Sequence, residues 1–181
     1  MSATPDPAAA WLVRPMTHAD WSDVARIYRE GIATGDATLE PGVPTWAEFD
    51  AAHSSGARLV GIADGEIAAW FALSPWSSRR VYRGVAWESV YVGAAHRGRG
   101  LGTRMLAAGV KASETHGIWT LFAGVLAENV ASLALHRRCG FRKLGIQRRV
   151  GQDRAGRWRD VVLLERRSGV VGGATAPIVH D

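Results

Sequence analysis

The amino-acid sequence predicts a mixed α/β fold in which antiparallel strands come first and a parallel crossover follows in the middle of the chain. The pair Asp64-Gly65 lies between two apolar runs, which is typical of a two-residue hairpin turn. A strand at 85–92 leads through a glycine-rich loop into a helical pattern and then into another strand at 119–125, the order expected for a crossover between parallel strands. The 181 residues are 47% hydrophobic, which is enough for one ordinary core.

In the first half of the chain, weak alternation predicts a strand that ends at Pro15. Thr17 then has the character of a helix N-cap, with Asp20 three residues on, and apolar residues follow at helical spacing. A stretch rich in Gly, Pro and Thr at 35–45 predicts a loop. The expected elements are a strand at 11–14, a helix to about residue 31, a short helix at 47–52, and paired strands at 58–63 and 66–73.

In the second half, glycines mark where helices end and turns begin. Gly117 ends one predicted helix, Cys139-Gly140 ends another, and Asp153–Gly156 separates the last two strands. The expected elements are a polar loop at 75–83, a strand at 85–92, a helix at 103–116, a strand at 119–125, a helix at 129–138, and strands at 141–150 and 157–166. We therefore expect one domain at 11–167 between flexible segments at 1–10 and 168–181.

Composition bounds the function. The formal net charge is +5, with a pI near 10.1 and a mean hydropathy of -0.05. A basic surface suits nucleic acid, a membrane or a phosphate-rich small molecule, but no run of five like charges occurs, so we interpret the arginines as a solvated surface and expect no nucleic-acid partner. Cys139 is the only cysteine, which excludes an intramolecular disulfide and a multi-cysteine metal site. Without a long apolar window or a signal-peptide pattern, we expect a cytoplasmic protein with no membrane association and no metal.

A glycine-rich loop, Arg97-Gly98-Arg99-Gly100-Leu101-Gly102-Thr103, lies between a predicted strand and an amphipathic helix. Glycines allow successive backbone N–H groups to converge, and the helix adds its positive N-terminal end, so a pyrophosphate fits, with Arg97 and Arg99 adding charge. The loop lacks the Lys-Ser/Thr of a Walker loop and the Gly-x-Gly-x-x-Gly of a dinucleotide fingerprint. An ordinary glycine-rich turn remains the alternative.

Two ordered motifs make the chain resemble a known family. Val90-Tyr91-Val92 before the loop Arg97–Gly102 is similar to the acetyl-CoA signature of the GCN5-related N-acetyltransferases (GNAT), and the segment from Asn129 to His136, followed by Gly140-Phe141, resembles their second signature. The resemblance implies the GNAT acyl-CoA N-acyltransferase fold, a mixed and mostly antiparallel central sheet with helices on both faces, and acetyl-CoA as co-substrate. The cofactor-binding residues that it implies are Val90, Tyr91, Val92, Arg97, Gly98, Arg99, Gly100, Leu101, Gly102, Thr103, Asn129 and Ser132.

Further segments resemble the phosphinothricin acetyltransferase branch of that family over roughly residues 12–165. They are Ile27-Tyr28 with Gly31-Ile32, Ala37-Thr38-Leu39-Glu40, Pro75-Trp76, Tyr82-Arg83, Glu88-Ser89-Val90-Tyr91-Val92, Leu135-His136 before Gly140-Phe141, and Gly156-Arg157-Trp158-Arg159-Asp160. That branch acetylates the α-amino group of glutamate-like compounds such as phosphinothricin, methionine sulfone and methionine sulfoximine, and the resemblance also implies a homodimer. Leu39 departs from a usual Phe and Ser77 from a frequent Arg, which leaves the acceptor less firmly specified than the reaction.

Acyl transfer to an amine requires an acceptor for the amine proton and benefits from a donor for the departing thiolate. Glu88, at the start of an apolar strand segment, is the candidate base; the alternative is an edge carboxylate that faces solvent or pairs with Arg83. His136 stands where many family members carry a Tyr that protonates the thiolate, and its alternative is a structural histidine. Asn129 is a candidate helix cap, pantetheine ligand or both, and Ser132 is either a cofactor contact or a helix-packing residue.

Glu40, Arg79 and Tyr82 are the candidates for the acceptor pocket, since a planar guanidinium suits a carboxylate or phosphinate and a carboxylate suits an ammonium. Cys139 is interpreted as a packing residue rather than a nucleophile. Three other functions stay open: transfer to a different amine (an aminoglycoside, a polyamine or a protein N-terminus), an acetyl-CoA sensor without turnover, and a nucleic-acid binder, which the net charge alone suggests.

Overall fold

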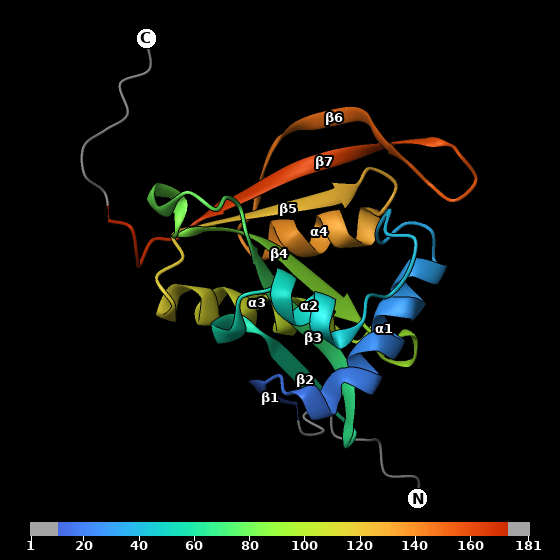
Figure 1. The fold of residues 1–181 in the computed structure, drawn as a ribbon, viewed down its shortest axis with the longest axis horizontal. Coiled ribbons are helices and arrows are strands. Elements are labelled where there is room, and N and C mark those ends of the chain that lie inside the picture. Colours follow the sequence, from blue (N-terminus) through green and yellow to red (C-terminus); the bar gives the residue numbers. More distant parts are fainter. Residues whose placement is uncertain (1–10, 174–181) are drawn as a thin grey trace, which may run out of the picture.

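The computed structural model describes residues 11–173 of the chain and contains a seven-stranded sheet in the order β1-β2-β3-β4-β5-β7-β6 (Figure 1). Every neighbouring pair is antiparallel except β4 and β5, which run parallel. The expected mixed, mostly antiparallel sheet with one parallel crossover is therefore confirmed. The expectation for 1–10, and that for most of 168–181, lies outside the described residues.

The strands are β1 (Leu12–Pro15), β2 (Leu59–Ala63), β3 (Glu66–Pro75), β4 (Val85–Val92), β5 (Thr120–Leu126), β6 (Arg142–Gln152) and β7 (Trp158–Arg167). The α-helices are α1 (Trp21–Ala33), α2 (Trp46–Ala52), α3 (Leu101–Thr115) and α4 (Val130–Arg138). Short 3₁₀ turns occur at His18–Asp20, Ser55–Ala57, Arg80–Tyr82 and Ala94–His96. Each expected helix and strand is present, and the bounds differ from the expected ones by at most two residues except at the start of α1. Thr17, the expected N-cap of that helix, caps the 3₁₀ turn instead, and α1 begins at Trp21 with Asp20 as its N-cap.

The sheet carries helices on both faces, and alternate side chains of β3 show which helices cover which face. Trp70 and Ala72 belong to a buried cluster with residues of α1 and α2, whereas Phe71 and Leu73 belong to one with residues of α3. α3 lies close against the sheet because Gly109 faces Phe71: a Cβ at this position would lie 2.4 Å from the Phe71 ring. This confirms helices on both faces.

The turn between β1 and α1 is fixed by a buried carboxylate. Asp20 accepts two hydrogen bonds from the Arg14 guanidinium, at 2.7 and 2.6 Å, and one from the Thr17 backbone N–H at 2.8 Å. These donors stabilise the ionised form, and the Arg14 bond contributes most, so the pKa of Asp20 falls to about 2. The pairing of Thr17 with Asp20 three residues on is thus part of a small network at the start of α1.

The sheet opens in its middle, between β4 and β5. The parallel pairs run only from Val85–Thr120 to Trp87–Phe122, although β4 continues to Val92 and β5 to Leu126. β3 stays paired with β4 as far as Val92, and β7 stays paired with β5 as far as Leu126. The two halves of the sheet therefore diverge and leave a gap. No helix in the described range 11–173 is long and apolar enough to cross a membrane.

Candidate active site

A cavity of about 770 Å³ occupies the gap between the diverging strands. Its lining comes from five places: the end of α1 with the loop that follows, β4, the glycine-rich loop with the start of α3, the end of β5, and α4. Segments far apart in the sequence therefore meet here. The cavity is large enough for a drug-sized ligand.

The edge of β4 that faces the gap presents backbone hydrogen-bonding groups. The Trp76 N–H donates to Val85 O, and the Gly93 N–H donates to Ala68 O, so the odd-numbered residues of β4 exchange bonds with β3. The intervening residues Val90 and Val92 therefore direct their N–H groups toward β5, which has diverged from them. Val90 and Val92 are both among the residues that the family resemblance implies for the cofactor.

The glycine-rich loop turns through two left-handed residues, Gly98 and Gly100, each with φ of 75°. Only glycine takes this conformation without strain, and Gly100 is the N-cap of the 15-residue helix α3. The helix N-terminus thus faces the cavity, which suits an anion. Arg97 lines the cavity, with its Nε 3.1 Å from Val92 O. Arg99 lies outside the lining and pairs with Asp64 at 2.6 Å.

Glu88 and His136 meet at the start of the gap. Glu88 on β4 and His136 on α4 have side chains only 2% and 3% exposed, and Glu88 Oε1 lies 2.6 Å from His136 Nε2. Neither residue pairs with Arg83 or faces solvent, which removes the alternative for Glu88. The second carboxylate oxygen, Oε2, is buried without a hydrogen-bond partner in the described structure. Both residues line the cavity.

The hydrogen bonds of His136 define where its protons are. Nδ1 lies 2.7 Å from the Ser132 carbonyl oxygen, which accepts only, so Nδ1 carries a proton. Nε2 and Glu88 Oε1 are then 2.6 Å apart with one proton between them, as imidazolium and carboxylate or as imidazole and carboxylic acid. Burial lowers the pKa of His136, but Glu88 and the Ser132 carbonyl raise it by more, so the net shift is upward. The pair acts as one site for one proton.

The start of α4 is tied to the loop after α1. The Asn129 side-chain oxygen accepts from the Ser132 N–H at 3.0 Å, which makes Asn129 the N-cap, and its Nδ2 donates to Asp36 O at 3.0 Å. Ser132 also has its hydroxyl 3.3 Å from His136 Nδ1. Asn129 and Ser132 both line the cavity. The cap is thus observed for Asn129, while cofactor contact remains a prediction for both.

The cavity brings together most of the residues expected for the cofactor, namely Val90, Tyr91, Val92, Arg97, Gly98, Gly100, Leu101, Gly102, Thr103, Asn129 and Ser132. It does not bring in the three residues expected for the acceptor. Tyr82 lines a second hollow with Trp76, and the Arg79 guanidinium lies 5.9 Å from the centre of the Tyr82 ring. Glu40 lies in the exposed loop after α1. The acceptor role of these three residues stays a prediction.

Several lining residues were missed by sequence reasoning. They are Gly31, Thr34, Asp36, Ala37, Ser89, His96, Ala123, Gly124, Val125, Glu128, Val130, Ala131, Leu135 and Arg138. Thr34, Asp36, Ala37 and Glu128 belong to irregular segments, whose position depends on contacts made far along the chain. Arg138 carried a usable signal, since it is a cation in the last turn of the helix that follows Asn129. The structure adds that this turn lies near the start of α3, because Leu135 packs against Gly102. No group of three metal-ligating side chains occurs among residues 11–173.

These features fit acetyl-CoA. Unpaired donors on β4 suit the amides of a pantetheine arm, and a glycine-lined helix N-terminus with Arg97 suits a pyrophosphate. The buried Glu88–His136 pair lies in the same cavity, where β4 and β5 begin to diverge. The arrangement can bind a long anionic thioester and exchange a proton beside its acyl end.

Comparison with known proteins agrees with this geometry. The model of the Acetyltransferase (GNAT) family matches residues 21–141. The L-methionine sulfoximine/L-methionine sulfone acetyltransferase of Pseudomonas paraeruginosa is 30% identical over 159 residues, which cover 84% of this chain and 92% of that protein. The phosphinothricin N-acetyltransferase of Alcaligenes faecalis is 30% identical over 164 residues, which cover 87% of this chain and 82% of that protein.

A solved structure has the same fold. The phosphinothricin acetyltransferase of Sinorhizobium meliloti, in complex with acetyl-CoA, superimposes with a TM-score of 0.80 at 27% identity and covers 92% of each chain. The family match spans most of the chain, and the matched relatives are acetyltransferases. The chain has the GNAT fold and belongs to the GNAT family, as an N-acetyltransferase that uses acetyl-CoA.

Proposed function

We propose that the protein transfers the acetyl group of acetyl-CoA to the α-amino group of a small glutamate-like amino acid, such as phosphinothricin, methionine sulfone or methionine sulfoximine. The names of the relatives at 30% identity support this acceptor class. The observation that carries the catalytic part of the proposal is the buried contact of 2.6 Å between Glu88 Oε1 and His136 Nε2 in the cavity. Both substrates bind together, and the amine attacks the thioester directly.

The proton path follows from the pair. After the Glu88–His136 pair has released its shared proton, it accepts one from the substrate ammonium, so that the neutral amine attacks the thioester carbon. The C–N bond forms, the C–S bond breaks, and the thiolate leaves. The pair then returns its proton to the thiolate, and the second proton that the former ammonium must lose leaves the amide nitrogen for solvent, which completes the balance. Glu88 lines the cavity, and its buried Oε2 has no hydrogen-bond partner in the described structure, so this oxygen is the one proposed to accept from the amine.

Direct attack is favoured over an acyl-enzyme. Cys139 is the only cysteine of the chain, and its sulfur lies 3.7 Å from the Thr103 carbonyl oxygen, outside the cavity lining. Burial raises the pKa of this thiol, which lowers its nucleophilic fraction at neutral pH. Neither of the functional alternatives without turnover accounts for a base and an acid in contact at the thioester end of the cavity.

We further propose roles for the residues outside the single-chain cavity. Glu40, Arg79 and Tyr82 contact the acceptor. Burial raises the pKa of the Tyr28 phenol most, and the negative charge of Glu40 raises it further, so Glu40 lies near Tyr28. The enzyme acts in the cytoplasm as a homodimer. An exposed edge strand supports the dimer, since β6 is unpaired on its outer side and exposes Leu144, Ile146 and Val150.

The test is thiol release from acetyl-CoA with a panel of amines: phosphinothricin, methionine sulfone, methionine sulfoximine, glutamate, a polyamine and an aminoglycoside. We expect turnover of the first three, and we expect Glu88→Gln to lower kcat by about 10²–10⁴-fold while acetyl-CoA still binds. Arg83→Gln is the matched control, because this nearby side chain lies outside the cavity and stacks on Trp119. Turnover confined to the polyamine or aminoglycoside would reject the amino-acid acceptor, and full activity in Glu88→Gln would reject the base.

A further inference from the structure

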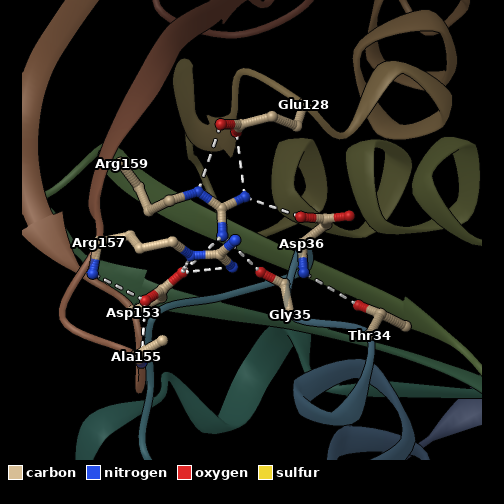
Figure 2. Close-up of polar contacts among 8 residues, drawn as sticks. All are labelled: Thr34, Gly35, Asp36, Glu128, Asp153, Ala155, Arg157 and Arg159. Carbon is tan, nitrogen blue, oxygen red and sulfur yellow. Dashed lines mark hydrogen bonds and ion pairs between the residues drawn. The ribbon is translucent and has the colours of Figure 1, made fainter.

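A buried arginine on β7 connects three separate segments at one end of the cavity (Figure 2). The Arg159 side chain is only 7% exposed, and it does not itself line the cavity. Its guanidinium lies between the loop after α1, the loop before α4 and the turn between β6 and β7. A buried guanidinium with charged partners is costly to place and sensitive to the loss of any partner.

The contacts use every nitrogen of the guanidinium. Nη2 lies 2.7 Å from Asp36 Oδ1 and 3.1 Å from Glu128 Oε2. Nε lies 3.3 Å from Glu128 Oε1, and Nη1 lies 3.0 Å from Gly35 O and 3.5 Å from Asp153 Oδ2. The two bonds to Glu128 form a fork that a lysine cannot reproduce.

Two of these partners belong to the cavity. Asp36 and Glu128 both line it, and their side chains are about half exposed, at 51% and 53%. The Arg159 guanidinium lowers the pKa of Glu128, and the negative charge of Asp36 raises it. The two carboxylates therefore repel each other, and the Arg159 guanidinium, which binds both, offsets this repulsion. Asn129 holds the backbone of Asp36 from the α4 side. Asp36 is thus fixed through both its carboxylate and its carbonyl.

The cavity has two electrostatically different ends. Near the start of α3 it presents Arg97, the helix N-terminus and Arg138, which suit phosphates. Near the start of α4 it presents Asp36 and Glu128, which repel phosphates and attract an ammonium group. An amine acceptor therefore has one favourable end by which to enter.

We propose that Arg159 is a positioning residue for the acceptor: by holding Asp36 and Glu128 together it fixes the acidic end of the cavity through which the amine reaches the thioester. This inference rests on the proposed function. Arg159 touches neither substrate and acts through its two carboxylate partners and the Gly35 carbonyl. The glycine-rich loop at the start of α3 shares none of these contacts, so we expect the phosphate contacts of acetyl-CoA not to depend on Arg159.

The test compares Arg159→Met, Arg159→Lys and Asp36→Asn with Arg142→Met as the matched control. Arg142 comes from the same hairpin, is 70% exposed and pairs with Glu165, which is not a partner of Arg159. We expect Arg159→Met to raise the acceptor KM by about tenfold or more with acetyl-CoA affinity unchanged, and Arg159→Lys to recover part of the loss. We expect Asp36→Asn to change the acceptor KM in the same direction, and the control to behave as wild type.

Hydrogen exchange of the full chain, with no substrate added, provides a second readout. In Arg159→Met the peptide over residues 34–45 should exchange faster, while a peptide from α3 should not change. Unchanged exchange, or an equal loss of acetyl-CoA affinity, would overturn the proposal; should Arg159→Met fail to fold, Asp36→Asn decides by the same two criteria. If the wild type acetylates no amino acid, the proposed class of acceptor is rejected. The exchange result still tests whether Arg159 holds the Asp36 loop in place.

Discussion

The Glu88–His136 pair shows how one hydrogen bond to a backbone carbonyl determines the chemistry of a side chain. Because Nδ1 must donate to Ser132 O, the other nitrogen receives or shares the proton of Glu88. The pair therefore has to lose its shared proton before it accepts another from the substrate. Its role as base is linked to pH through His136, whose pKa is raised.

The first prediction concerns the pH dependence of kcat. His136 has an unperturbed pKa of about 6.5, and the pair raises it, so kcat should rise with pH through an apparent pKa above that value. The measurement is kcat at saturating acceptor from pH 5.5 to 9. A profile that is flat over this range, or that falls with rising pH, would contradict the role of the pair as proton acceptor.

A direct control observes the imidazole by NMR, with His136→Gln to assign its signals. In Glu88→Gln the carboxylate is lost while burial remains, so the pKa of His136 should fall. Stability follows the same sign: because the folded pKa is raised, the contribution of the pair is fully present below about pH 6.5 and is lost as the pH rises through the folded pKa. An unchanged His136 titration in Glu88→Gln would refute the coupling.

The residues of the site differ in how far sequence could predict them. Glu88 and His136 belong to motifs and were named from them, but their contact joins positions 48 apart, and nothing in either motif states it. Asp36 and Arg159 are 123 positions apart, and neither was assigned a role. Local spacing identifies residue types on one helix or strand, whereas partners brought together by tertiary packing require the fold.

At the scale of elements, glycine decides how closely α3 approaches the sheet. Gly109 faces Phe71, which is fully buried, and a Cβ would lie 2.4 Å from its ring. An overpacked core typically costs about 1–3 kcal/mol, and alanine returns up to about 1 kcal/mol of helix propensity.

The second prediction is therefore that Gly109→Ala lowers the free energy of unfolding by about 1–2 kcal/mol. Chemical denaturation with a common m-value is the measurement. Lys111→Ala, an exposed substitution on the same helix, serves as the control and should change stability by less than about 0.5 kcal/mol. A Gly109→Ala protein as stable as the wild type would mean that α3 can move away from Phe71 at no cost.

The elements themselves were largely predictable because their signals are local. The turn at Asp64-Gly65 takes left-handed φ values of 56° and 82°, as the dipeptide indicated. The helix after the glycine-rich loop, α3, was predicted to begin at Thr103. It begins at Leu101, because the left-handed Gly100 caps it directly. The divergence of β4 from β5, which creates the cavity, has no local signal, since it depends on which strands each one pairs with on its other side.

At the scale of the whole molecule, the order of elements was enough to predict the class of fold. An antiparallel first half and one parallel crossover lead to a sheet with a single parallel junction, and the cavity lies at that junction. The acidic and basic ends of the cavity are a property of the assembled fold, because Asp36, Glu128 and Arg138 come from three different segments. Net charge alone, at +5, gave no indication of this polarity.

The last prediction concerns assembly. β6 is an edge strand of 11 residues, and its outer side exposes the backbone together with Leu144, Ile146 and Val150, at 44%, 44% and 49%. The outer edge of such a strand presents backbone N–H and C=O groups with which another chain can pair. We expect a dimer by light scattering at micromolar concentration, and we expect Ile146→Lys to yield a folded monomer, while Lys143→Ala on the same strand stays dimeric. A monomeric wild type would reject the homodimer, and a dimeric Ile146→Lys protein would place its interface elsewhere than on β6.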